Sequence, residues 1–345
     1  MASLRSLNRF RALVLLFSLL SDLSVGVLSL GVGINYGQIA NNLPSPSRVA
    51  LLLRSLNISR VKLYDADPNV LSAFSNSNVD FVIGLGNENL QAMTDPGQAQ
   101  TWIQQHVQPY LSQTKITCIT VGNEVLTGND TQMKSHLLPA MQTVNNALNN
   151  LGLSREVYVT TAHSTGILGS PDQVSLEYVL FQPNPGIRDP VTNLNYDNML
   201  YAQIDAVYSA MKALGHTDVQ VKISETGWPS KGDPDEVGAT PENAALYNGN
   251  LLQRIEQNQG TPANPSIPID VYVFALFNED LKPGPASERN YGLLYPDGSP
   301  VYRIGLQLQE QQQGYLPHID YSSSGQQKTV YSSFSLLLIA LAFLI

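Results

Sequence analysis

The sequence of 345 residues is poor in the residues that bind metals and form cross-links. Its single cysteine, Cys118, cannot form a disulfide within the chain, and its place in the apolar run 116–121 predicts a small buried side chain. The five histidines are scattered and show no spacing typical of metal ligands. We therefore predict no metal site and no cofactor.

Positive charge is also scarce. The chain has 19 lysines and arginines against 28 acidic residues, so its formal net charge is −9 at pH 7. An acidic surface disfavours a nucleic acid as partner, because the phosphate backbone repels it. No glycine-rich phosphate loop follows the first predicted strand, residues 32–36, which disfavours an open dinucleotide-binding sheet.

No apolar run reaches the roughly 20 residues that a membrane-spanning helix needs. Near the start, residues 12–20 are apolar, follow Arg5, Arg9 and Arg11, and precede small residues. This order is typical of a secretory signal peptide, which we place at residues 1–29. The alternative, a membrane helix, is disfavoured because the run is short.

The last residues form a second targeting pattern. An apolar run, residues 334–345, follows a polar spacer and four small residues, 322–325. This order is typical of the signal for a glycosylphosphatidylinositol (GPI) anchor. We expect the lipid at Ser323, removal of residues 324–345 and a short linker over residues 316–323. The alternative is a hydrophobic tail that anchors the chain directly.

Two sequons for N-glycosylation, at Asn57 and Asn129, fit an exported chain. Together with the two terminal patterns, they predict a secreted protein. We expect a GPI lipid to hold it at the outer face of the plasma membrane, in the cell wall.

Between these signals, residues 30–315 show short β-rich runs that alternate with helical stretches, which predicts parallel βαβ units and a (β/α)8 barrel of the TIM type. The predicted strands cover residues 32–36, 60–64, 81–85, 116–121, 157–161, 219–224 and 269–277. The predicted helices cover residues 47–56, 69–74, 99–110, 133–149, 198–214 and 242–257.

Only seven strands are convincing, whereas a barrel of this type has eight. The gap falls between His163 and Asn193, a stretch rich in glycine, proline and asparagine that offers one candidate strand at residues 174–181. A structureless loop of this length is uncommon inside a compact domain. The count therefore predicts that about one βα unit, around the sixth strand, is missing.

Two glutamates stand where barrel enzymes place their chemistry, at the carboxyl ends of strands. Glu124 ends the fourth predicted strand and Glu225 ends the penultimate one. Two facing carboxyl groups are what glycoside hydrolysis requires, with one as acid and the other as nucleophile or base. Asn123 can bond a sugar hydroxyl, and Trp228 can offer a flat face to a sugar ring. The alternative for each glutamate is a solvated charge at a strand end.

The motifs around these residues resemble those of the plant endo-1,3-β-glucanases of glycoside hydrolase family seventeen, in particular the lipid-anchored wall enzymes acting on callose. The resemblance rests on Gly-Val-Gly-Ile-Asn-Tyr-Gly (31–37), Arg-Val-Lys-Leu-Tyr-Asp (60–65), Val-Gly-Asn-Glu (121–124), Ser-Glu-Thr-Gly-Trp-Pro-Ser (224–230) and Tyr-Gly-Leu-Leu-Tyr-Pro-Asp-Gly (291–298).

The resemblance implies that Glu124 is the general acid/base and Glu225 the nucleophile of a retaining endo-hydrolase of β-1,3-glucan. In such an enzyme the two carboxyl groups stand about 5–5.5 Å apart. It further implies a metal-free monomer whose sugar groove and polar support are formed by Tyr36, Tyr64, Asn123, Phe277, Glu279, Lys282 and Glu288.

The chain departs from the family after residues 165–169. Relatives carry there a helix, the sixth strand and an aromatic motif, roughly one βα unit of 30 or more residues. A barrel without one wall leaves strand edges unpaired, so we expect lower stability and activity than in a complete relative. Two other functions stay open: a non-catalytic glucan-binding barrel, and a barrel glycosidase for β-1,4 polymers.

Overall fold

A computed structural model of the chain describes residues 32–165 and 174–303. Its main sheet has seven parallel strands in the order β5-β4-β3-β2-β1-β9-β8. The strands are β1 (Val32–Asn35), β2 (Arg60–Lys62), β3 (Asp80–Leu85), β4 (Lys115–Asn123), β5 (Tyr158–Ala162), β8 (Lys222–Thr226) and β9 (Asp270–Val273). These are the seven strands that the sequence predicts.

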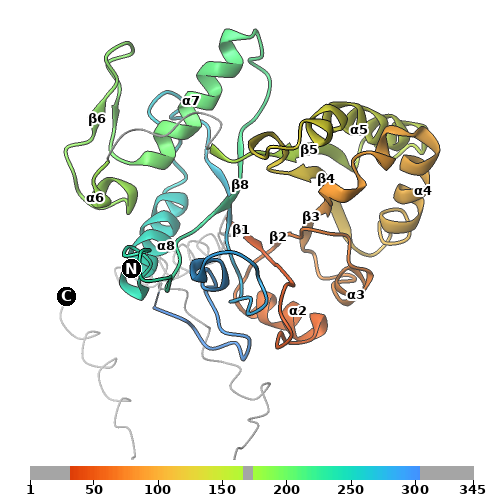
Figure 1. Cartoon of the computed structure of the whole chain (residues 1–345), viewed down its shortest axis with the longest axis horizontal. Coiled ribbons are helices and arrows are strands. Elements are labelled where there is room, and N and C mark those ends of the chain that lie inside the picture. Colours follow the sequence, from red (N-terminus) through yellow and green to blue (C-terminus); the bar gives the residue numbers. More distant parts are fainter. Residues whose placement is uncertain (1–31, 166–173, 304–345) are drawn as a thin grey trace, which may run out of the picture. The chain divides into compact units, whose positions relative to one another are not determined.

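The predicted helices form within a few residues of their expected bounds. They are α2 (Pro46–Ser55), α3 (Pro68–Ala73), α4 (Pro96–His106), α5 (Thr131–Asn150), α7 (Met199–Ala213) and α8 (Pro241–Glu256). α4 and α5 lie beside β3–β5, whereas α7 and α8 lie on the side of β8 (Figure 1).

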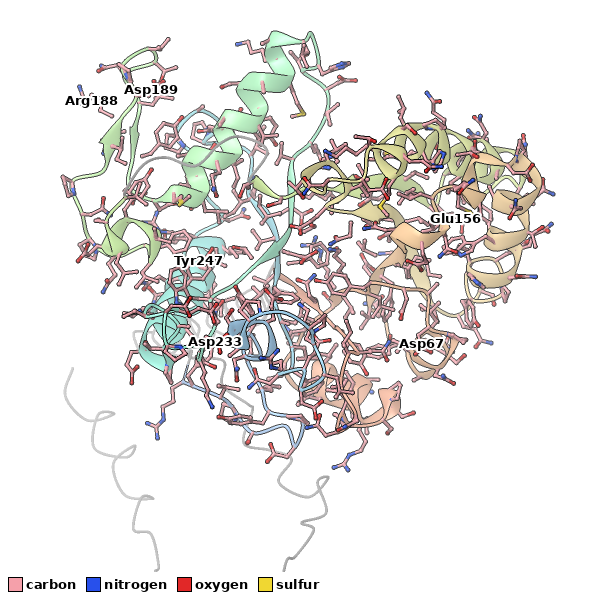
Figure 2. All side chains as sticks on the ribbon, in the orientation of Figure 1. Asp67, Glu156, Arg188, Asp189, Asp233 and Tyr247 are labelled. Atoms are coloured by element: carbon pink, nitrogen blue, oxygen red, sulfur yellow. The ribbon has the colours of Figure 1, made fainter. Side chains whose placement is uncertain are left out.

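Short polar side chains start several of these helices. The side chain of Asp67 (labelled in Figure 2) accepts a hydrogen bond from the backbone N–H of Asn69, and Pro68 follows as the first helical residue. Asp95 and Asp130 cap α4 and α5 in the same way. Each cap satisfies a backbone donor that the first helical turn leaves free.

Burial follows the position of each strand in the sheet. In the inner strand β3, the five residues from Phe81 to Leu85 are all buried, as expected for a parallel strand covered on both faces. In β8, by contrast, no residue is fully buried, and Lys222 is exposed. The apolar core therefore lies around β1–β4 and β9 and thins toward β8.

The two outer strands, β5 and β8, each pair with only one neighbour within the described residues. A side-chain contact spans the space between them: Lys222 Nζ donates a hydrogen bond to the Tyr158 hydroxyl at 3.0 Å. A complete barrel would hold one more strand here. The fold is thus a (β/α)8-type barrel truncated by one unit, as the strand count predicts.

The candidate strand at residues 174–181 is wrong, because this segment contains the helical turn α6 (Leu176–Val179). The Ser175 side chain accepts a hydrogen bond from the Tyr178 N–H and starts the turn. Leu180 and Phe181 are buried, and the Leu180 carbonyl accepts a bond from Asn250 of α8. The segment therefore packs on a helix and not in the sheet.

A small antiparallel pair, β6 (Ile187–Arg188) and β7 (Asn195–Tyr196), follows α6 and was not predicted. Figure 2 labels Arg188 and Asp189 on this hairpin. The Asp189 side chain accepts hydrogen bonds from the backbone N–H groups of Val191 and Thr192, which closes the turn. This local Asp turn is the signal that the sequence reading missed.

Several predicted features lie outside the described residues. These are the signal peptide at residues 1–29, the linker and anchor signal at residues 316–345 with Ser323, and the junction at residues 166–173. Within the described parts, no helix is long and apolar enough to cross a membrane.

Candidate active site

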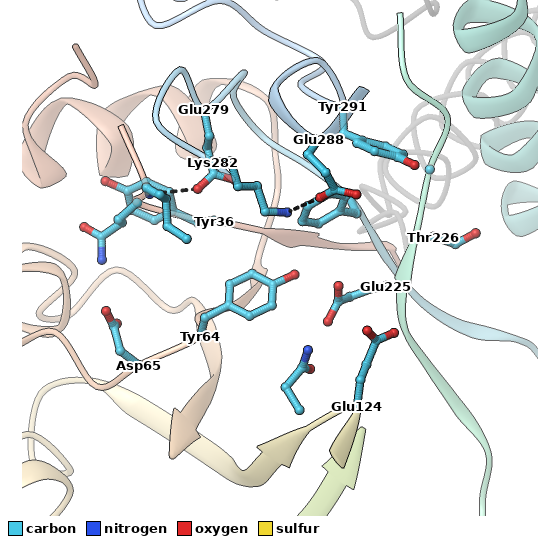
Figure 3. Close-up of a pocket in the computed structure, with 16 residues that line it drawn as sticks. Tyr36, Tyr64, Asp65, Glu124, Glu225, Thr226, Glu279, Lys282, Glu288 and Tyr291 are labelled. Carbon is cyan, nitrogen blue, oxygen red and sulfur yellow. Dashed lines mark hydrogen bonds and ion pairs between the residues drawn. The ribbon is translucent and has the colours of Figure 1, made fainter. Parts of the chain in front are cut away.

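A pocket of about 640 Å³ lies at the carboxyl ends of the strands and collects most of the predicted site residues. Glu124 and Glu225 both line it, and Figure 3 shows their carboxylates directed into the same space from different strands. The other predicted residues in its lining are Tyr36, Tyr64, Asn123, Glu279, Lys282 and Glu288.

Glu124 follows the last residue of β4 in a left-handed backbone conformation, with φ 52°. Its N–H donates a hydrogen bond to the carbonyl of Ala162 at the end of β5, at 2.9 Å. Its own carbonyl accepts bonds from the N–H and hydroxyl of Thr127. A non-glycine residue in this conformation costs about 1–2 kcal/mol, which the surrounding bonds offset.

The environment of Glu124 favours its protonated form. Partial removal from water raises the pKa of Glu124 above its ordinary value, and the nearby charge of Glu225 raises it further. The ammonium of Lys62 acts in the opposite direction. A carboxyl group that keeps its proton to higher pH is suited to protonate a leaving oxygen.

Glu225 lies in a different electrostatic setting. Its Oε1 is 2.6 Å from the ammonium of Lys62, a residue of β2 that is only 1% exposed. A buried ammonium beside the carboxylate stabilises the negative charge of Glu225. The two glutamates of the pocket therefore differ in their surroundings: Glu225 forms an ion pair with Lys62, whereas the pKa of Glu124 is raised.

Tyr64 supports the same carboxylate from another direction. Its hydroxyl accepts a hydrogen bond from Asn35 Nδ2 at 3.2 Å, so its own hydrogen is free for Glu225. Burial, followed by the charge of Glu225 and this hydrogen bond, raises the pKa of Tyr64 well above its usual range. Asn35 also donates to the Ser224 carbonyl at 3.0 Å, next to Glu225 in the chain.

A group of charged residues closes the other wall of the pocket. Lys282 Nζ lies 3.2 Å from Glu288 Oε2 and 4.1 Å from the centre of the Phe274 ring. Glu279 is 3% exposed and accepts a hydrogen bond from the N–H of Ile39 at 2.8 Å. Burial raises the pKa of Glu279. Figure 3 shows these residues facing Glu225 across the pocket.

Two predicted residues are not part of the lining. Trp228 donates its indole N–H to the Gly238 carbonyl at 2.8 Å and packs on Tyr247 of α8, which Figure 2 labels. Phe277 is 3% exposed and meets Tyr36 edge to face. The Phe277 side chain is buried behind the pocket, whereas the Trp228 side chain is half-buried.

Sequence reasoning missed several residues that the structure places at the site: Asn35, Lys62, Asp65, Phe274 and Tyr291. One of them carried a usable signal. Lys62 stands in the otherwise apolar run Val61–Leu63, and a lysine in a buried strand needs a charged partner.

The described residues contain no group of three or more histidine, cysteine, aspartate or glutamate side chains that could hold a metal ion. The pocket offers paired carboxyl groups, an ammonium and a tyrosine hydroxyl instead. This set can move a proton and form a covalent bond to carbon, which is the chemistry of a two-carboxylate glycosidase.

Comparison with protein families agrees with this chemistry. The model of the family Glycosyl hydrolases family 17 matches residues 32–172 and 168–306. Glucan endo-1,3-beta-glucosidase 14 of Arabidopsis thaliana is 59% identical over 359 aligned positions, which cover 91% of this chain and 89% of that protein. Glucan endo-1,3-beta-glucosidase 11 of the same plant is 50% identical over 325 positions, which cover 81% of this chain and 76% of that protein.

Two solved structures are similar in fold and sequence. CJP38, a beta-1,3-glucanase and allergen of Cryptomeria japonica pollen, has a TM-score of 0.74 at 35% identity and covers 80% of this chain and 99% of its own. One structure from a study of two plant beta-glucan endohydrolases with distinct substrate specificities has a TM-score of 0.72 at 30% identity, covering 79% and 99%.

The alignments also give the approximate size of the truncation. For the first relative, 91% of 345 residues is about 314, so about 45 of the 359 aligned positions have no residue in this chain. For the second, 81% of 345 is about 279, which leaves about 46 of 325 positions empty. The two segments of the family match meet at residues 168–172, between β5 and β8 in the sequence.

The family match spans most of the described residues, and both relatives align over more than two thirds of the chain. The two segments of the family match meet between β5 and β8, the two strands that pair on one side only within the described residues. This chain therefore belongs to family 17 of the glycosyl hydrolases and lacks about one βα unit of the barrel.

Proposed function

We propose that this chain hydrolyses internal β-1,3-glucosidic bonds of β-1,3-glucan, such as callose, with retention of configuration. The observation that carries the proposal is the unequal pair in one pocket. Glu225 forms an ion pair with Lys62 at 2.6 Å, and the pKa of Glu124 is raised above its ordinary value. The names of the relatives, glucan endo-1,3-beta-glucosidases, support β-1,3-glucan as the substrate.

In the proposed reaction, Glu124 gives its proton to the glycosidic oxygen while a Glu225 oxygen bonds the anomeric carbon. The bond to the leaving sugar breaks, and a glycosyl ester of Glu225 remains. Glu124, now a carboxylate, then takes a proton from water as the water oxygen attacks the same carbon. This second step releases the sugar and restores both carboxyl groups.

The test is the release of reducing ends from a soluble β-1,3-glucan. We expect Glu225→Gln to abolish release, because the amide is isosteric but cannot act as the nucleophile. A matched control is Glu88→Gln, which changes an exposed glutamate at the same end of the sheet but outside the pocket lining. Full activity of the Glu225 variant would overturn the assignment.

The substrate needs its own comparison. One similar structure comes from a study of beta-glucan endohydrolases with distinct substrate specificities, so the linkage has to be measured directly. We expect cleavage of β-1,3-glucan and none of a β-1,4-linked glucan under equal conditions. The reverse preference would point to a barrel glycosidase for β-1,4 polymers.

Within the described residues β5 and β8 each pair on one side only, which favours one rival function, a barrel that binds glucan without cutting it. Incubation of the pure protein with insoluble glucan separates the two, because it reports retention and soluble products together. Cleavage supports the hydrolase, whereas retention without any product supports the rival.

The proposal includes export and a lipid anchor. Asn57 and Asn129 are both exposed, as N-glycosylation requires. In plant cells we expect the protein on the outer plasma membrane as a monomer, attached through Ser323. A phosphatidylinositol-specific phospholipase should release it into the medium. Retention on the membrane after this treatment would instead favour a directly inserted tail.

A further inference from the structure

We propose that Asn87 is the residue that positions the acid/base Glu124, by acting as a substitute backbone partner for Asn123. The inference rests on the proposed function, since it assigns a role within the same site. Asn87 is the first residue of the short 3-10 helix η1 (Asn87–Asn89), which follows β3. It does not line the pocket.

Both polar atoms of the Asn87 side chain bond the main chain of one residue. Asn87 Oδ1 accepts a hydrogen bond from the N–H of Asn123 at 2.7 Å, and Asn87 Nδ2 donates to the Asn123 carbonyl at 2.9 Å. A carboxamide that meets both main-chain groups of a residue reproduces the pairing of a neighbouring strand. Asn123 immediately precedes Glu124.

This contact begins where the regular ladder ends. The pairing of β3 with β4 runs up to Leu85 opposite Val121, and no further pair joins the two strands. On the other side, the pairing of β4 with β5 shifts register between Thr120 and Asn123. The main chain at Asn123 therefore depends on the Asn87 side chain where its β3 neighbour has ended.

The backbone on either side of Asn123 needs such support. Gly122 has φ 70° and Glu124 has φ 52°, so Asn123 lies between two left-handed residues. A glutamate in this conformation is disfavoured and relaxes when its neighbours allow it. Two bonds to the peptide groups of Asn123 hold this turn, and the turn sets the direction of the Glu124 side chain.

Besides the bonds from Thr127, Glu124 has a support from an edge strand. The Glu124 N–H bonds the Ala162 carbonyl on β5, whose far side is unpaired within the described residues. β3, from which Asn87 follows, is buried and paired on both sides. The two hydrogen bonds between the Asn87 side chain and Asn123 thus connect the turn before Glu124 to the well-packed part of the sheet.

The test separates loss of acid catalysis from general damage. A β-1,3-glucan has a poor leaving group, which needs the proton of Glu124. In a dinitrophenyl glycoside of a short β-1,3-glucan oligosaccharide, the leaving group is dinitrophenolate, which departs without that proton. Both substrates need the nucleophile Glu225 equally. The kcat/KM of each substrate reports the step that forms the glycosyl-enzyme, so their ratio isolates the contribution of the acid.

For Asn87→Ala in the full chain, we expect kcat/KM on glucan to fall by about tenfold to a hundredfold, since a displacement near 1 Å costs about that much. We expect kcat/KM on the aryl glycoside to change less than about threefold, because acid catalysis contributes little there. Azide, a nucleophile that needs no general base, should raise the kcat of the variant on the aryl glycoside.

Two further variants complete the design. Asn87→Asp keeps the acceptor for the Asn123 N–H but places an oxygen against the Asn123 carbonyl. It should therefore show the same selective loss of activity on glucan. If the alanine variant does not fold, the aspartate variant provides the test. Asn89→Ala is the matched control, because Asn89 lies in the same 3-10 helix and its side chain donates its hydrogen bond to the exposed Glu88, away from Asn123. Its kinetics should equal those of the parent chain.

Glu124→Ala serves as the reference for complete loss of the acid/base. If it loses activity on glucan but not on the aryl glycoside, and the Asn87 variants follow it, the inference holds. If Glu124→Ala is selective but the Asn87 variants are fully active, or lose activity equally on both substrates, only the inference is wrong. If Glu124→Ala itself shows no selectivity, the proposed function fails and the inference with it.

Discussion

The ammonium nitrogen of Lys62 lies 2.6 Å from Oε1 of Glu225, although the first residue belongs to β2 and the second to β8. In the sheet, β1 and β9 separate these two strands. The ion pair therefore crosses the interior of the truncated barrel. It ties the strand of the proposed nucleophile, which has only one paired neighbour within the described residues, to the well-packed centre of the sheet.

Removing this ammonium should impair catalysis. We expect Lys62→Met to lower kcat/KM on β-1,3-glucan by about a hundredfold or more, because a preorganised charge at a reacting group is worth about that much. A thermal melt of the same variant should show destabilisation, since Glu225 loses its partner while only 28% exposed.

A double variant provides the control for the ion pair. In Glu225→Gln with Lys62→Met no unpaired charge remains, so this protein should melt above Lys62→Met alone. Unchanged kcat/KM in the single variant would show that the ion pair has no part in catalysis.

The charges around Glu124 should control the alkaline limb of the pH profile, which reports loss of the acid's proton. Burial is the largest cause of the raised pKa of Glu124, followed by Glu225; Glu288 raises it too, and Lys282 lowers it. Glu288→Gln should therefore move the alkaline limb of kcat/KM to lower pH, and Lys282→Met should move it to higher pH.

Each of these two variants also frees the other partner of the Lys282–Glu288 ion pair. In Glu288→Gln the freed Lys282 ammonium lowers the pKa of Glu124 further, and in Lys282→Met the freed Glu288 carboxylate raises it further. Lys231→Met, an exposed lysine outside the pocket lining, should leave the limb in place. Shifts of the same sign in both test variants would contradict the assignment of this limb to Glu124.

The buried carboxyl of Glu279 should make stability depend on pH. Burial raises the pKa of Glu279 in the folded chain above its unfolded value. The stability that this group contributes is then complete below the unfolded pKa and is lost as the pH rises through the folded pKa. We expect Glu279→Gln, which keeps an acceptor for the Ile39 N–H, to lose less Tm than the parent as the pH rises above the ordinary pKa of a glutamate, about 4.3. An equal loss in both proteins would rule out this role.

Two glycines with the same backbone conformation allow a matched test of the turn before Glu124. Gly122 has φ 70° and Gly152 has φ 73°, but a Cβ on Gly122 would lie 2.8 Å from a methyl of Val125, whereas nothing lies within 4 Å of one on Gly152. Gly152→Ala should cost about 1–2 kcal/mol of unfolding free energy from backbone strain alone. Gly122→Ala should cost more in denaturant titrations and also reduce activity, because the clash displaces the turn. Equal costs and full activity would argue against a strict requirement at Gly122.

The truncation should lower both stability and activity. Within the described residues, β5 and β8 each pair on one side only, and no residue of β8 is fully buried. Inserting the roughly 45 missing positions from the 59% identical relative should raise the Tm measured by circular dichroism and raise kcat/KM. The reciprocal deletion in that relative should have the opposite effect. Equal melting midpoints with and without the unit would contradict this prediction.

By itself, the sequence determined the alternation of strands and helices, the seven strands and the gap after the fifth. These features follow from the local hydrophobic periodicity and from the glycine, proline and capping residues that end helices and strands, which act over a few residues. It also indicated Glu124 and Glu225, because a parallel sheet brings the carboxyl ends of all its strands to one edge.

Only the tertiary structure decided which side chains support those two glutamates. Lys62 and Glu225 are 163 positions apart in the chain, and Asn87 and Asn123 are 36 apart, so no local pattern pairs them. Trp228 bonds the Gly238 carbonyl and packs on Tyr247, and residues 176–179 form a helical turn, after which the Leu180 carbonyl bonds Asn250 of α8. Such contacts depend on the order of strands in the sheet and on competition among distant partners, which the residues in sequence order do not carry.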